Sequence, residues 1–231
     1  MNLSPVTRFR SASRTVVAQP ELSLRIVRDA VWSNRRRAAE IALIAIVVGV
    51  ALVFTGRNLF HYPQYELDEG TYVGSAWTMV TDFKLFYYTY TYSHPPFGWL
   101  QIGLWSTITG GFGQFGMSIN SGRAFMLVLT ALSTLIVFRI VAIQTGRSSA
   151  AAFAGLLFAS SPLAIALHRQ VYLDNIGTFW LLVSILLLQT ANGRLGRVVL
   201  SACAFAVAFL TKEVFAAMLP GMIFLAFSRS H

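Results

Sequence analysis

Charged residues are scarce in this 231-residue chain, making up 12% of it against 55% hydrophobic residues. The mean hydropathy is +0.61. A water-soluble globular protein needs more polar surface than this composition supplies. The sequence therefore predicts an integral membrane protein.

Acidic residues and cysteine are scarcer still. Nine Asp and Glu stand against 18 Lys and Arg, and eight of the arginines precede residue 38. Because this basic excess lies directly before an apolar run, we expect residues 1–37 to form a disordered cytoplasmic tail, and we expect no nucleic-acid partner. Cys203 is the only cysteine, which excludes an internal disulfide and argues against a cysteine-based metal site.

Six apolar runs predict six membrane-spanning helices. The first reaches about 27 Å at ~1.5 Å per residue, enough to cross the hydrocarbon. Residues 97–109 are shorter and run into a glycine-rich segment, so we predict an interfacial or re-entrant segment there. The predicted spans are 38–55, 122–143, 149–167, 176–190, 195–211 and 214–227. The expected fold class is an all-α integral membrane protein with about six transmembrane helices, in a module covering 38–231.

The long segment between the first two spans, residues 56–121, is dense in aromatic residues, which favour the headgroup level of a bilayer. We expect interfacial helices in it. One is predicted over 69–80, lying on the membrane with Tyr72 and Ala76 on its apolar face.

The distribution of arginines predicts the orientation. Arg35, Arg36 and Arg37 directly precede the first span and place the N-terminus in the cytoplasm. With six spans, the arginines of the later short loops fall on that side too. The segment 56–121 and the polar residues around 168–174 and 212–213 then fall on the non-cytoplasmic face of a multi-pass plasma-membrane protein.

Asp68 and Glu69 open the helix predicted over 69–80. Asp68 could simply be an N-cap, since an acidic side chain there satisfies free N–H groups and the helix dipole. Alternatively, a carboxylate at the membrane surface serves as a general base, its pKa tuned by partial burial and by the neighbouring acid.

Further polar residues lie on the same predicted face. His94 precedes a Pro-Pro pair and could be an ordinary interfacial imidazole. Arg169 and Asp174 could be a snorkelling arginine and a helix-capping aspartate. Lys212 and Glu213 could pair in a tight turn, but ionisable groups at membrane depth cost roughly 2.5–3.5 kcal/mol each, which makes them candidates for function.

These residues together suggest a reaction. A carboxylate and a cation beside a membrane suit a transfer whose leaving group is a lipid phosphate, because the acceptor hydroxyl needs a base and the departing phosphate needs positive charge. So good a leaving group requires no general acid.

Four motifs in this order resemble the N-terminal half of the superfamily of protein O-mannosyltransferases and aminoarabinose transferases, which are membrane glycosyltransferases of the GT-C fold. The motifs are Leu67-Asp68-Glu69-Gly70-Thr71-Tyr72, His94-Pro95-Pro96-Phe97-Gly98, Arg169 through Asp174, and Leu210-Thr211-Lys212-Glu213. The resemblance implies inverting transfer of a sugar from a polyprenyl-phosphate donor to a hydroxyl or phosphate acceptor on the non-cytoplasmic face.

The resemblance also implies roles for single residues. Asp68 matches the proposed base or acceptor-orienting residue, and Glu69 matches its companion. Arg169 and Asp174 match residues linked to the donor and to active-site organisation, and Lys212 matches a candidate phosphate partner at the end of the fifth span.

Two further cations complete the expected site. His94 lies where the aminoarabinose branch carries a phosphate-contacting lysine, so we assign it to the donor phosphate. Lys84 could add a cation to the pocket, although no motif supports it. No cofactor is required and no metal ligand is assigned, although a divalent metal between carboxylates is conceivable.

The chain departs from the family in two ways. Trp99 stands where the protein mannosyltransferases commonly have lysine, which counts against the protein-acceptor branch. Family members also typically have about twice as many spans, so we expect a truncated gene, a degenerate copy, or half of a split enzyme completed by a second polypeptide. A non-catalytic membrane partner of a larger transferase is the alternative function, and a transporter is disfavoured because the polar groups gather at one interface.

Overall fold

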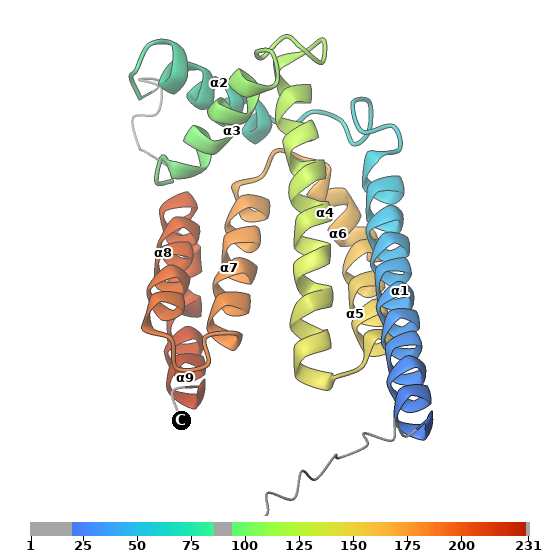
Figure 1. Cartoon of the computed structure of the whole chain (residues 1–231). Helices are drawn as coiled ribbons and strands as arrows, with labels where there is room; N and C mark the ends of the chain where they lie inside the picture. Colours follow the sequence, from blue (N-terminus) through green and yellow to red (C-terminus); the bar gives the residue numbers. More distant parts are fainter. Residues whose placement is uncertain (1–19, 86–93, 230–231) are drawn as a thin grey trace, which may run out of the picture. The chain divides into compact units, whose positions relative to one another are not determined.

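The computed structural model describes residues 20–85 and 94–229, with side chains described within these ranges from Asn34 to Ser228. Every regular element in these residues is a helix (Figure 1). Residues 40–231 form one unit and residues 1–39 another, with the boundary inside the first helix, α1 (Pro20–Gly56). Residues 20–37 were predicted to be disordered, but they belong to α1 and are helical. Residues 1–19 of the predicted tail lie outside the described residues.

Two helices are long and apolar enough to cross a bilayer, judged by length and composition. They are Asn34–Gly56 within α1, and α4 (Ser118–Thr145). A third span results if α5 (Ser148–Ser160) and α6 (Pro162–His168), which meet at a bend of 64°, are one broken span. The chain thus has the apolar helices of an all-α membrane protein, while the count of six spans stays a prediction.

The remaining apolar helices are shorter than a typical span. They are α7 (Leu173–Gln189), α8 (Leu195–Thr211) and the pair formed by a 3₁₀ helix, η1 (Glu213–Met218), and α9 (Leu219–Arg229). The spans predicted at 176–190 and 195–211 fall on α7 and α8, and the span predicted at 214–227 is divided between η1 and α9.

The span predicted over 149–167 is not one straight helix, because it breaks between Ser160 and Pro162. Proline has no N–H to donate and its ring collides with the preceding turn. The residue before a proline is driven out of the helical region, and Ser161 has φ −61° and ψ 123°. Pro162 then begins α6 in a new direction.

Two helices outside these spans lie side by side, α2 (Leu67–Thr81) and α3 (Phe97–Ile108) (Figure 1). Both correspond to segments predicted to be non-spanning. A Cβ added at Gly103 of α3 would lie 2.9 Å from the carbonyl oxygen of Ala76 on α2, closer than real Cβ atoms come. Glycine at this position therefore permits the close approach of the two helices.

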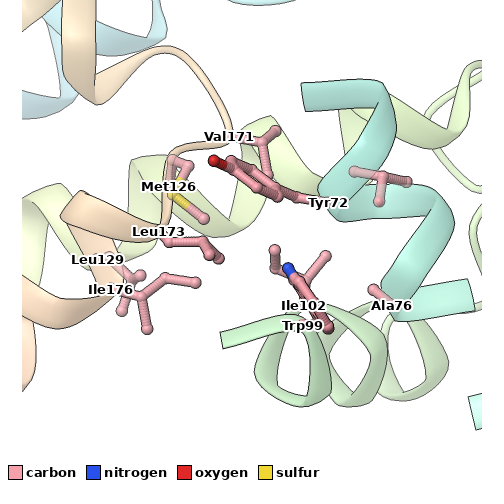
Figure 2. Close-up of a cluster of buried hydrophobic side chains, with 10 residues drawn as sticks. Tyr72, Ala76, Trp99, Ile102, Met126, Leu129, Val171, Leu173 and Ile176 are labelled. Atoms are coloured by element: carbon pink, nitrogen blue, oxygen red, sulfur yellow. The ribbon is translucent and has the colours of Figure 1, made fainter. Parts of the chain in front are cut away.

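The main hydrophobic core lies between α2, α3, α4 and the start of α7 (Figure 2). Tyr72 and Ala76 of α2 are buried against Trp99 and Ile102 of α3. The expectation that this face of α2 lies on the membrane is wrong, because α3 covers it. The buried members of the cluster are Tyr72, Val73, Ala76, Trp99, Ile102, Met126, Leu129, Val171, Leu173 and Ile176.

The two ends of the helices in residues 40–231 differ in charge. α2 and α3 lie at the end where α4 and α7 begin and α8 finishes (Figure 1). At the other end α4 and α7 finish, and α5 and α8 begin. Arg139 lies in the last two turns of α4, where it pairs with Glu40 at 2.7 Å, while Arg147 and Arg194 immediately precede α5 and α8.

Candidate active site

A cavity of about 630 Å³ lies where α2, α6, the start of α7 and the end of α8 meet. Its volume is typical of small-molecule sites in proteins. Most of the residues that line it are polar, whereas α6 contributes apolar side chains. The lining residues are Asp68, Tyr72, Ser161, Leu163, Ala164, Leu167, His168, Tyr172, Asp174, Asn175, Thr178 and Lys212.

Asp68 lines this cavity from the first turn of α2, where it is exposed. The N-cap of α2 is Glu66, so the alternative that Asp68 is the N-cap is wrong. No hydrogen bond or ion pair from the described residues reaches the Asp68 carboxylate. This carboxylate is therefore available to a ligand in the cavity.

Lys212 and Asp174 form an ion pair on another wall of the cavity, with 2.7 Å between Nζ and Oδ2. Asp174 lies in the first turn of α7, and Lys212 follows the last residue of α8 in extended backbone, with φ −154° and ψ 125°. The Asp174 side chain is 53% exposed, and the Lys212 side chain is 21% exposed. An ammonium group has three N–H donors, so Lys212 can bind an anionic ligand while it still contacts Asp174.

Tyr72 also lies beside a second pair of polar side chains, His94 and Glu213. Its ring lies 6.0 Å from that of His94, whose Nδ1 is 3.1 Å from the Glu213 carboxylate. Burial raises the pKa of Tyr72 to about 12, and the carboxylates of Asp68, Asp174 and Glu213 add to the shift. Tyr72 thus remains a neutral hydrogen-bond donor, and His94 lies behind it, outside the lining of the cavity.

Glu69, the neighbour of Asp68, points into the protein. It forms a bidentate ion pair with Arg123 of α4, at 2.9 Å to Nε and 2.7 Å to Nη2, and both side chains are 0% exposed. The Nη1 group of Arg123 also donates to the carbonyl oxygens of Leu59 and Pro63, each at 2.9 Å. Glu69 is thus committed to the interior and does not line the cavity.

The buried pair is part of a larger set of links around Asp68. Glu69 Oε1 accepts a hydrogen bond from the backbone N–H of Val171 at 2.9 Å, and the Tyr172 hydroxyl donates to Glu66. That hydroxyl also lowers the pKa of the Glu66 carboxyl. Residues on both sides of Asp68 are therefore tied to the segment that leads into Asp174, which fixes the two cavity walls relative to each other.

Sequence reasoning missed Arg123, although a signal was present. Arg123 is the second residue of the apolar run predicted as 122–143. A charged residue inside such a run requires a buried partner, because an unpaired charge there is costly. Which acid supplies that partner depends on how α2 and α4 pack, and the sequence does not show it.

Arg169 is not brought together with the other predicted residues. Its guanidinium donates to the carbonyl oxygen of Phe54 on α1 and lies 5.7 Å from the ring of Tyr62. The adjacent His168 lines the cavity instead.

Lys84 is exposed beyond the end of α2 and does not line the cavity. A helix of 15 residues is about 22 Å long, so Lys84 lies far from Asp68 at its other end. Within the described residues, no group of three or more His, Cys, Asp and Glu side chains is arranged to hold a metal ion.

The family model of the dolichyl-phosphate-mannose-protein mannosyltransferases matches residues 93–231, more than half of the chain. The chain belongs to this family. No curated protein and no solved structure matches it. The match confirms the family predicted from the four motifs.

Membership of the mannosyltransferase family indicates a membrane glycosyltransferase of the GT-C type, and it implies a lipid-linked sugar donor. The match includes His94, Arg169, Asp174 and Lys212. The matched segment begins after α2, so only the place of Asp68 in the cavity connects this residue with the site.

Proposed function

We propose that this chain transfers a sugar from a polyprenyl-phosphate donor to a hydroxyl or phosphate acceptor, with inversion, in the cavity between α2, α6, α7 and α8. One observation carries the proposal. The cavity holds the carboxylate of Asp68, which no described residue hydrogen-bonds or pairs with, together with a cation, Lys212, from a distant part of the sequence.

In the proposed reaction, Asp68 accepts the proton of the acceptor hydroxyl. The acceptor oxygen then forms a bond to the anomeric carbon as the bond from that carbon to the phosphate oxygen breaks. The electron pair of the broken bond leaves with polyprenyl phosphate, and Lys212 stabilises the negative charge that develops there. A phosphate acceptor that still carries one proton can lose it to Asp68 in the same way.

The remaining predicted residues have supporting roles in this proposal. Asp174 holds Lys212 in place, and Glu69 holds the helix that carries Asp68. His94 acts through Tyr72, against which its ring lies. Arg169 contacts Phe54 and Tyr62 and does not line the cavity, so we assign the phosphate first to Lys212.

We place the cavity on the non-cytoplasmic face of the plasma membrane. Arg139 lies near the end of α4, and Arg147 and Arg194 directly precede α5 and α8. These helix ends are opposite α2 and α3 (Figure 1), and short loops rich in arginine favour the cytoplasm. The same rule places the basic N-terminal segment in the cytoplasm.

The test is a transfer assay with the purified full chain in lipid vesicles. Polyprenyl-phosphate sugars labelled in the sugar are offered with an extract of the source cell's envelope as acceptor, and nucleotide sugars serve as the control donors. We expect label to move from the lipid donors only. If no lipid donor is used, and the chain instead binds a larger membrane transferase and changes that protein's rate, the chain is a non-catalytic partner.

A further inference from the structure

His168 is a cavity residue that no sequence motif singled out. It is the last residue of α6, and its ring lies 5.1 Å from that of Phe158 on α5. Among the described residues, no hydrogen bond reaches its ring nitrogens. The imidazole is thus held in place by ring packing while its polar atoms remain available.

Several other polar groups in the lining are already engaged. Lys212 and Asp174 are paired with each other, and the Tyr172 hydroxyl donates to Glu66. Asn175 Nδ2 donates to the carbonyl oxygens of residues 167 and 170, both at 3.0 Å. These last two bonds fix the backbone on either side of His168, so its position is built into the wall.

His168 also lies where the lining changes character. On the same wall Leu163, Ala164 and Leu167 of α6 line the cavity, and Leu163 and Leu167 are 71% and 42% exposed. The side chains from α2, the start of α7 and the end of α8 are polar. His168 therefore separates an apolar wall from a polar one.

A lipid-linked sugar has the same division within one molecule. Its sugar is polar, its prenyl chain is apolar, and the phosphate joins the two. We propose, on the basis of the proposed function, that His168 donates a hydrogen bond to the donor phosphate while Leu163, Ala164 and Leu167 contact the adjoining part of the prenyl chain. Lys212 then binds the same phosphate from the part of the cavity that α7 and α8 form, a role that Arg169 does not fill because it does not line the cavity.

The experiment measures binding, which does not depend on turnover. The full chain in lipid nanodiscs is titrated with a polyprenyl phosphate and with the matching polyprenol, which lacks the phosphate. Because a hydrogen bond to a charged group is worth about 1.5–3 kcal/mol, His168→Leu should weaken binding of the polyprenyl phosphate about tenfold or more. Binding of the polyprenol should change little. His168→Gln should recover part of the loss, because the amide can still donate.

His61→Leu is the matched control, since His61 is exposed and does not line the cavity. If His168→Leu weakens the binding of polyprenol and of polyprenyl phosphate equally, or weakens the binding of neither, the assignment of His168 is overturned. Equal competition by an anionic phospholipid would also overturn it, because the site would then be one for any lipid phosphate. Failure of the wild type to transfer sugar while this binding pattern holds would refute the proposed function alone.

Discussion

Two ion pairs involving the cavity end of this protein have the same shortest distance and different surroundings. Glu69–Arg123 and Asp174–Lys212 are both 2.7 Å long. The first pair is 0% exposed on both sides, with backbone carbonyls filling other donor positions of the arginine. The second is open to the cavity. Burial, and not distance, separates a pair that holds the fold from a pair that can exchange a partner for a ligand.

The adjacent carboxylates of Asp68 and Glu69 differ in the same way, since the first is exposed and the second is buried. Consecutive residues on an α-helix point about 100° apart, so Asp68 and Glu69 leave α2 in different directions. Asp68 lines the cavity and Glu69 enters the interior. A shared acidic motif can thus contain one residue for chemistry and one for position.

The largest expected effect comes from breaking the buried pair. Arg123→Leu leaves the Glu69 carboxylate buried without its partner, and the loss of one partner of a buried pair costs about 3–5 kcal/mol. We expect a large fall in the melting temperature of the purified chain in detergent. The double variant Glu69→Leu with Arg123→Leu should melt higher than Arg123→Leu, since no charge is left unpaired. An unchanged melting temperature in the single variant would show that the pair does not hold the fold.

The second-largest effect is expected from altering the pair that is open to the cavity, Asp174–Lys212. Lys212→Met removes the charge that, in the proposed reaction, stabilises the leaving phosphate, and losses of this kind lower kcat about 10²–10³-fold. The melting temperature should move little, because an exposed pair contributes about 0–1 kcal/mol. Lys212→Arg, which keeps the charge, should retain most of the rate. If Lys212→Met destabilises the chain as much as Arg123→Leu does, the distinction between the two pairs is wrong.

The smallest effect concerns the exposed pair behind Tyr72. Hydrogen bonds from its own backbone N–H and from His94 lower the pKa of Glu213 below its ordinary value of 4.5. A lowered pKa in the folded state means a contribution to stability that is present above pH 4.5 and is lost as the pH falls through the folded value. The Glu213 side chain is 52% exposed, so the contribution should be under about 1 kcal/mol.

Glu213→Gln isolates that contribution. The variant should melt slightly below the wild type at neutral pH, and the difference should disappear in acid. A difference that persists in acid would have to come from packing.

The sequence predicted the helices well wherever hydrophobic length or pattern decides the structure. The helix predicted at 69–80 is present, and the apolar runs are helical. The segment at 97–109, predicted to be interfacial or re-entrant, contains the helix α3. The break at Ser161 was missed although Pro162 is visible in the sequence, because the hydropathy of the run does not change there. The apolar face of α2 was assigned to lipid, since a pattern shows that a face is buried and does not show what covers it.

The site was predicted in part for the same reason. Asp68, Asp174 and Lys212 were expected together, and all three line one cavity. The predicted membrane topology puts residues at the same end of a helix bundle, and this was sufficient to predict that these three residues lie together. It does not set the direction in which a side chain leaves the backbone, so Arg169 was expected in the cavity and contacts α1 instead.

The most direct test of the account compares two aspartates of α2 and its C-cap in the transfer assay. Asp68 lines the cavity from the first turn, and Asp82 is the exposed residue that ends the helix. Asp68→Asn should lower the transfer rate at least about 10²-fold with an unchanged melting temperature, because the acceptor loses its base. Asp82→Asn should transfer at the wild-type rate. A wild-type rate in Asp68→Asn would contradict the central claim that this carboxylate acts on the acceptor.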